Sequence, residues 1–85
     1  MFLVKIFITP IPTVNDPQGQ TILGSLRQLG FSTVGSVRVG KFITVRLDED
    51  REETAELKVK EMCEMLLANS VIEDYRFELE RVNSA

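Results

Sequence analysis

Apolar residues follow a period of two at both ends of the chain, and a helical period in two segments between them. Residues 2–9 place four large apolar side chains on one face, which predicts a strand with one buried face: Phe2, Val4, Ile6 and Ile8. The other face holds Leu3, Lys5, Phe7 and Thr9. Proline cannot donate a hydrogen bond to a neighbouring strand, so Pro10 and Pro12 end this one.

A helix is predicted after this strand. Asp16 suits the position that caps a helix N-terminus, and Pro17 suits the first helical position, where a missing N–H has no cost. The helix should run to about Leu29, because Gly30 favours the left-handed conformation that ends helices. Its expected buried stripe consists of Ile22, Leu23, Leu26 and Leu29.

Residues 33–47 are rich in β-branched side chains and predict a hairpin around Gly40-Lys41. A two-residue turn sets the apolar side chains of the two strands on opposite faces. A three-residue turn or a bulge sets them on one face, and the apolar pattern favours this second register. It pairs Val39 with Ile43 and Val37 with Val45.

The acidic segment 48–53 opens a second predicted helix, because negative charge stabilises the positive end of the helix dipole. Its core stripe recurs at helical spacing: Ala55, Val59, Met62, Cys63 and Leu66. Asn69 is expected to end this helix in the left-handed conformation. Beyond it, Tyr75, Phe77 and Leu79 alternate with charged residues, which predicts a half-buried final strand.

The element order βαββαβ predicts an α/β protein of the α+β type with ferredoxin-like topology, in which an antiparallel sheet carries both helices on one face. Residues 1–85 are expected to form one domain around one core. The open face of the sheet should display three large apolar side chains, Leu3, Phe7 and Phe42. Such a patch favours association, so the sequence predicts a homo-oligomer, most simply a two-fold dimer through this face.

Charge and hydropathy exclude two classes of partner. The net charge is −3, and the acidic residues are concentrated in the second half of the chain, where residues 48–85 hold twelve of the thirteen. An acidic protein without a basic stripe is a poor binder of nucleic acid. No apolar run is long enough to cross a membrane or to serve as a secretory leader, so the cytoplasm is the expected compartment.

The residue types that common catalytic sites require are missing. The chain has no histidine and one cysteine, which excludes an internal disulfide, a cysteine-ligated iron–sulfur cluster and a histidine-based triad. We therefore expect no catalytic residue, no metal and no cofactor in this chain. Cys63 lies on the stripe of the second helix, so we interpret it as a buried structural thiol.

Several short segments, which lie in order along most of the chain from Lys5 to Glu80, together resemble the PurS family, the small subunit of phosphoribosylformylglycinamidine synthase. The segments are Asp16-Pro17-Gln18-Gly19, Leu26 through Phe31, Arg38-Val39-Gly40-Lys41, Met62-Cys63, Leu67-Ala68-Asn69 and Val71 through Tyr75. The chain departs from the family pattern at Ser70, where such proteins usually have proline, and in the loop before Asp16. Both departures concern loop geometry only.

The resemblance implies an accessory role in de novo purine biosynthesis. The family's complex converts formylglycinamide ribonucleotide, glutamine and ATP into formylglycinamidine ribonucleotide, glutamate, ADP and phosphate. A glutaminase subunit releases ammonia, and a synthetase subunit uses ATP and magnesium. The resemblance implies that this chain, without a cofactor of its own, bridges those two subunits and supports the transfer of ammonia.

A regulatory module similar to ACT domains is the alternative with the same topology. Such domains bind small molecules at dimer interfaces, often through a glycine-rich turn after the first strand. Here that segment is rich in proline and leads into a helix, which argues against the alternative. We expect contacts with the partner subunits, and within a homodimer or a dimer of dimers, at Leu3, Phe7, Arg38, Lys41, Phe42, Asn69, Glu73, Asp74 and Tyr75.

Overall fold

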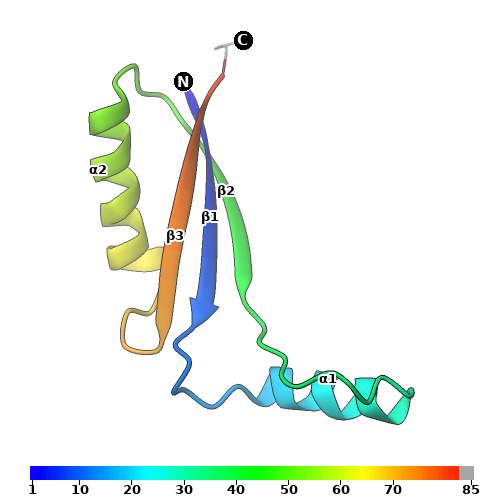
Figure 1. Cartoon of the computed structure of the whole chain (residues 1–85). Helices are drawn as coiled ribbons and strands as arrows, with labels where there is room; N and C mark the ends of the chain where they lie inside the picture. The colour runs from blue at the N-terminus through cyan, green and yellow to red at the C-terminus, as the bar shows by residue number, and fades with distance from the viewer. Residues whose placement is uncertain (83–85) are drawn as a thin grey trace.

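The computed structural model describes residues 1–82 and has one antiparallel sheet (Figure 1). Strands β1 (Phe2–Pro10), β2 (Lys41–Leu47) and β3 (Glu73–Arg81) are arranged in the order β2-β1-β3. Helices α1 (Pro17–Gln28) and α2 (Glu52–Met62) connect them, and α2 continues into a π-helical turn, η1 (Cys63–Leu67). The predicted α+β class with an antiparallel sheet is confirmed.

The core lies between the middle strand and α2. The four side chains predicted on the buried face of β1 are at most 3% exposed: Phe2, Val4, Ile6 and Ile8. Ala55, Val59 and Cys63 pack against them and are fully buried, as predicted from the helical stripe. The flanking strands complete the core with half-buried side chains on the same face: Ile43, Val45, Leu47, Tyr75, Phe77 and Leu79.

The prediction that Leu66 belongs to this core is wrong, since its side chain is 83% exposed. The cause is the π-helical turn, in which the N–H of Ala68 donates to the carbonyl of Cys63 five residues earlier, at 2.9 Å. A wider turn rotates the chain less per residue. Leu67 therefore takes the core-facing position that a regular α-helix would give to Leu66.

The predicted hairpin is absent from the described chain, and the sheet has three strands where the sequence predicted four. Residues 32–40 are not part of any strand, and β2 begins only at Lys41. Two-residue hairpin turns, and the common three-residue turns with a bulge, require a positive φ angle, but Gly30, at 101°, is the one residue of the described chain with a positive φ. Gly40 is needed for a different reason, because a Cβ there would overlap the carbonyl oxygen of Ile8.

The chain around Asn69 also differs from the prediction, because this residue does not have a positive φ. It organises a turn instead. Its side-chain Oδ1 accepts from the N–H of Val71 at 3.2 Å, and its carbonyl accepts from the N–H groups of Ile72 and Glu73 at 3.0 and 2.7 Å. An asparagine side chain that bonds the backbone two residues on can close a turn without left-handed geometry.

Residues 17–40, which we call the arm, project away from the sheet (Figure 1). The arm consists of α1 and the segment that runs back along it towards β2. The radius of gyration is 16.6 Å, whereas a compact domain of this length has one of roughly 12 Å. The prediction that α1 joins α2 on one face of the sheet is therefore wrong, and α2 covers that face alone.

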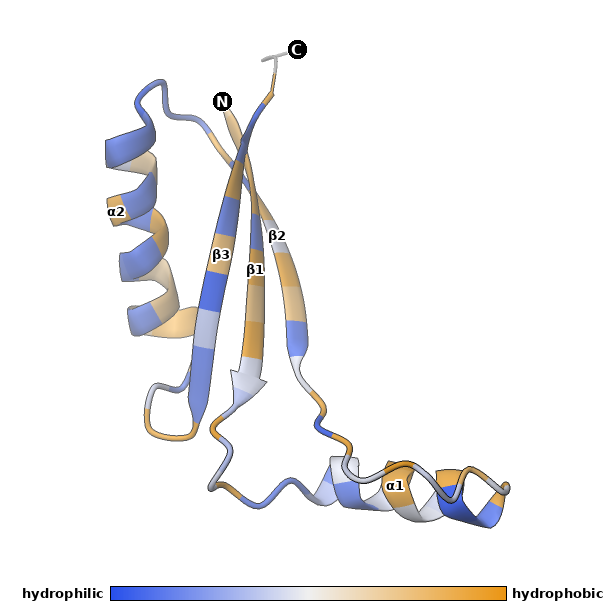
Figure 2. Cartoon of the chain, in the orientation of Figure 1, coloured by the Kyte–Doolittle hydropathy of each residue, from blue (hydrophilic) through white to orange (hydrophobic). Residues whose placement is uncertain are grey.

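The apolar residues predicted as a stripe are present on α1 (Figure 2), but the stripe is only partly buried, because Leu23 and Leu26 are half-buried and the others are exposed. Gly19 is the buried residue of this helix, while Ile22 is 43% and Leu29 74% exposed. Phe31, just beyond Gly30, is 55% exposed. The helix thus has the sequence of one that packs on a sheet, and within the described chain it has no sheet to pack on.

Candidate partner-binding surfaces

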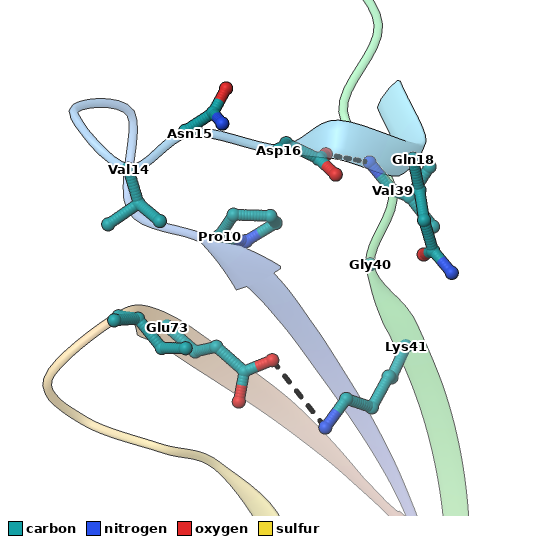
Figure 3. Close-up of a pocket in the computed structure, with 10 residues that line it drawn as sticks. Pro10, Val14, Asn15, Asp16, Gln18, Val39, Gly40, Lys41 and Glu73 are labelled. Atoms are coloured by element: carbon teal, nitrogen blue, oxygen red, sulfur yellow. Dashed lines mark hydrogen bonds and ion pairs between the residues drawn. The ribbon is translucent and has the colours of Figure 1, made fainter. Parts of the chain in front are cut away.

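The base of the arm is held by one buried carboxylate, that of Asp16 (Figure 3). Its Oδ1 accepts from the N–H of Gly19 at 3.1 Å, which caps α1 as the sequence predicted. Its Oδ2 accepts from the N–H of Val39 at 2.8 Å. These two hydrogen bonds, that from Val39 first, lower the pKa of Asp16 below its ordinary value. A single side chain therefore ties the start of the arm to its end.

Two further contacts fix the direction of the arm. Arg38 donates from Nη2 to the carbonyl oxygen of Ile11 at 2.6 Å, which links the end of the arm to the loop that precedes it. Gly19 packs so closely on the returning segment that a Cβ would overlap the carbonyl oxygen of Val37. Both ends of the arm are bonded to each other and to the loop after β1. Contacts within a single chain therefore fix the direction of the arm.

A pocket of about 210 Å³ lies beside the arm base, between that loop and the start of β3 (Figure 3). Nζ of Lys41 and Oε2 of Glu73 form an ion pair across it at 3.5 Å. The other carboxylate oxygen of Glu73 accepts from the N–H of Asn69 at 2.8 Å. The charged groups of this pocket are thus engaged with one another and with the backbone, which suits a structural junction better than a reaction site.

The open face of the sheet carries an aromatic pair. Phe7 lies opposite Phe42 in the β1–β2 register, with ring centroids 5.0 Å apart. The guanidinium of Arg76 stacks over Phe7, 4.0 Å from the ring centroid, and Lys5 pairs with Glu80 at 3.6 Å. Phe42 is 58% exposed. The predicted placement of these aromatic residues is confirmed, but charged neighbours cover part of the patch.

The opposite, helix-covered face holds two titratable groups that the arrangement keeps uncharged. Burial, and secondarily the carboxylate of Glu64, raises the pKa of the Cys63 thiol. Burial and the same carboxylate also raise the pKa of Tyr75, whose hydroxyl donates to Oε1 of Glu64 at 3.3 Å. Cys63 is fully buried, as predicted. A neutral buried thiol packs as a small apolar side chain and is a poor nucleophile.

The structure distributes the nine predicted interface residues over three places. The open face holds Leu3, Phe7, Phe42 and Asp74, the arm-base end of the sheet holds Arg38, Lys41, Asn69 and Glu73, and the helix-covered face holds Tyr75. The prediction did not include the five most exposed large apolar side chains of the described residues, which lie elsewhere: Leu29, Leu57, Met65, Leu66 and Val71. Hydrophobic periodicity could not show that these side chains are exposed. An apolar stripe has the same spacing whether it packs on its own chain or on another chain.

A metal site and a membrane-spanning helix are both absent from the part of the chain that the structure describes. Within residues 1–82, no three histidine, cysteine, aspartate or glutamate side chains gather as a metal site would require. Within the same range, no helix has the length and hydropathy needed to cross a membrane.

Comparison with known proteins identifies the family. Residues 3–81 match the sequence profile of PurS, described as phosphoribosylformylglycinamidine (FGAM) synthase. The phosphoribosylformylglycinamidine synthase subunit PurS of Bacillus subtilis is 42% identical over 83 residues, which cover 96% of each chain.

Solved structures agree with the sequence match. Bacillus subtilis PurS superposes with a TM-score of 0.86 at 41% identity, over 95% of this chain and all of that one. A chain of the PurLQS structure from Thermotoga maritima superposes with a TM-score of 0.82 at 31% identity, over 94% and 99% of the two chains. The family expected from the sequence is confirmed, and the chain belongs to the PurS family of phosphoribosylformylglycinamidine synthase subunits.

Proposed function

We propose that this chain is the small accessory subunit of a phosphoribosylformylglycinamidine synthase. One observation carries the proposal: the chain matches, over nearly its whole length, proteins named as the PurS subunit of that enzyme and a chain of the PurLQS structure. The reaction consumes formylglycinamide ribonucleotide, glutamine and ATP. In this proposal, a glutaminase subunit and a synthetase subunit perform the chemistry, and this chain bridges them and supports the passage of ammonia.

The residues of the chain support a role without catalysis. The sequence has no histidine, its one thiol is buried with a raised pKa, and the charged groups of the arm-base pocket are engaged. We infer that ATP and magnesium are held by the synthetase subunit and that this chain binds no cofactor. We also propose that the chain works in the cytoplasm. Thiols stay reduced in that compartment, and the one cysteine of the chain, Cys63, is free.

The arm-base end of the sheet is the surface we assign to a partner subunit. Four of the six segments that carry the family resemblance meet there, at Asp16, Lys41, Asn69 and Glu73. Several of them have a structural task in the monomer, but the side chain of Lys41 is 58% exposed and reaches the pocket mouth. We further propose that the chain forms a homo-oligomer, because the arm and η1 expose large apolar side chains that association would bury.

Reconstitution tests the function. The glutaminase and synthetase subunits of the same organism are assayed with and without this chain, once with glutamine and once with ammonium as the nitrogen donor. We expect the chain to be required for synthesis from glutamine and to matter much less for synthesis from ammonium, because only the first needs transfer between subunits. Equal glutamine-dependent activity without the chain would refute the proposal.

A charge reversal at the assigned surface gives the second test. Lys41→Glu should weaken co-purification with the partner subunits, whereas Lys60→Glu, on the exposed side of α2, should not. Sedimentation of both variants alone separates a lost partner contact from a changed homo-oligomer. If the two variants bind the partner subunits equally well, then Lys41 does not lie in the interface.

A further inference from the structure

A second hollow lies at the arm base. It shares Pro10 with the pocket described above, but its other lining residues are different: Thr9, Pro12, Ser36 and Arg38. Its volume is about 490 Å³. Small-molecule sites of proteins occupy roughly 300–1,000 Å³, so the hollow has room for an organic molecule rather than for a single small ion.

The segment that returns from the arm lines this hollow from one face. Exposure alternates along it, with Ser36, Arg38 and Gly40 exposed and with Val37 and Val39 half-buried. Alternate residues of an extended chain point to opposite sides. Val39 lies against α1, which leaves Ser36 and Arg38 to line the hollow together.

Arg38 is held in place but keeps most of its hydrogen-bonding capacity. Its Nη2 donates to the carbonyl oxygen of Ile11 at 2.6 Å, and the N–H groups of Nε and Nη1 remain available. No ion pair of the described residues includes Arg38, whereas Lys41 in the neighbouring pocket is paired with Glu73. The nearby carboxylate of Asp16 accepts from backbone N–H groups with both oxygens. The hollow thus presents a fixed positive charge without a directly bonded carboxylate.

Two hydroxyls complete the set of donors. Thr9 and Ser36 are exposed, and no hydrogen bond within residues 1–82 engages either hydroxyl. Gly40 lets the returning segment approach Thr9, because a Cβ there would lie 3.3 Å from Cγ2 of that threonine. Asp74, opposite Thr9 in the β1–β3 register, lines the neighbouring depression of the open face and not this hollow. A guanidinium with two hydroxyls is a donor set for an anion, and it suits the several oxygens of a phosphate.

Two proline rings form the apolar part of the hollow. Pro10 is half-buried and Pro12 is exposed, and both line the same space as the polar groups. A proline ring has no N–H donor, so it offers only dispersion contacts to a ligand. An inorganic anion would leave these rings uncovered. The hollow therefore suits a phosphate that is attached to a sugar or base ring.

We propose that this hollow binds a phosphorylated ring compound of the size of a mononucleotide. Arg38 donates to the phosphate oxygens, together with the hydroxyls of Thr9 and Ser36, and the ring of the ligand packs on Pro10 and Pro12. The ligand binds without reacting, because the lining contains no base that could activate either hydroxyl. The proposal goes beyond the accessory function and does not depend on the partner subunits.

A ligand at this place connects the arm with the sheet. Ser36 and Arg38 belong to the arm, whereas Thr9 and Pro10 belong to β1. A phosphate held from both sides adds a bridge beside the hydrogen bond from Arg38 to Ile11. Because such a ligand binds the folded chain only, it should also raise the melting temperature.

Titration of the purified chain tests the proposal. AMP, ribose 5-phosphate, inorganic phosphate and adenosine are added at constant ionic strength, and the backbone amides are followed by NMR. We expect saturable shifts around Thr9 and Ser36 with AMP, at a dissociation constant below about 1 mM, weaker binding of inorganic phosphate, and none of adenosine. Equal binding of AMP and inorganic phosphate would overturn the contact with the proline rings. If no phosphate compound gives saturable shifts, the site does not exist.

Two arginine variants and one hydroxyl variant locate the site. Arg38→Gln should weaken AMP binding about tenfold or more, because it removes charge-assisted hydrogen bonds. Arg27→Gln is the matched control, since Arg27 is also an exposed arginine of the arm that donates to a backbone carbonyl, that of Val34 at 3.2 Å, but lies outside the hollow. Ser36→Ala keeps the bond from Arg38 to Ile11 and should weaken binding about threefold, which separates a lost ligand contact from a displaced arm.

Equal loss of AMP binding in Arg38→Gln and Arg27→Gln would show attraction to the general positive charge of the arm and would overturn the proposal. Unchanged binding by both Arg38→Gln and Ser36→Ala would place the ligand elsewhere. No partner subunit is present in these titrations, so their failure is distinguishable from failure of the reconstitution assay.

Discussion

The same substitution at two glycines of α1 should have opposite effects on stability. A Cβ at Gly24 meets no atom within 4 Å, so Gly24→Ala gains the helix propensity of alanine, about 0.5–1 kcal/mol. A Cβ at Gly19 would overlap the carbonyl oxygen of Val37 and lie 2.8 Å from Oδ2 of Asp16. Relief requires the returning segment to move by roughly 1 Å, and overpacking of that kind costs about 1–3 kcal/mol.

Gly19→Ala should therefore lower the free energy of unfolding by about 1–2 kcal/mol, while Gly24→Ala raises it slightly. Urea denaturation followed by circular dichroism measures both, at several protein concentrations because association contributes to stability. If Gly19→Ala is as stable as Gly24→Ala, then α1 does not lie against residue 37, and the arm base described above is wrong.

Three further predictions address other parts of the molecule. Cys63→Ala should lower the free energy of unfolding by about 1–2 kcal/mol as a small core truncation, and a thiol reagent should modify native Cys63 far more slowly than the unfolded chain. Because the folded pKa of Asp16 is lowered, its contribution to stability is present above the ordinary aspartate pKa of about 4 and is lost as the pH falls further; an NMR titration of the Val39 and Gly19 amides should show this, and Asp16→Asn should abolish it. Phe7→Glu should leave intact, in sedimentation equilibrium at tens of micromolar, the homo-oligomer that we propose for the arm and η1; a monomer would instead place the interface between copies on the open face.

Local patterns predicted the elements well where each segment buries its own face. Alternation from Phe2 to Ile8 and the stripe from Ala55 to Cys63 identified the two halves of the core, because both partners lie in the same chain. Asp16 and Pro17 located the start of α1 for a similar reason, since capping is decided within one turn of helix.

The predictions failed where the partner of a segment is not specified by the segment itself. The stripe of Ile22 and Leu29 has helical periodicity, but periodicity does not say which sheet it packs on. Gly40 occurs where a hairpin turn was expected, yet its small size serves the close approach of β1. For the candidate site, the residues around Lys41 and Glu73 were identified from a family resemblance, whereas the buried role of Asp16 in joining both ends of the arm needed coordinates.

The two ends of the described chain meet at the far end of the sheet from the arm (Figure 1). The N–H of Val82 donates to the carbonyl oxygen of Met1 at 3.0 Å, because β1 and β3 run side by side in opposite directions. A fluorophore or affinity tag attached near either end would therefore sit away from the arm and its base. The same adjacency makes the described chain suited to circular permutation, in which a short linker joins residues 1 and 82 and new ends open at the tip of the arm.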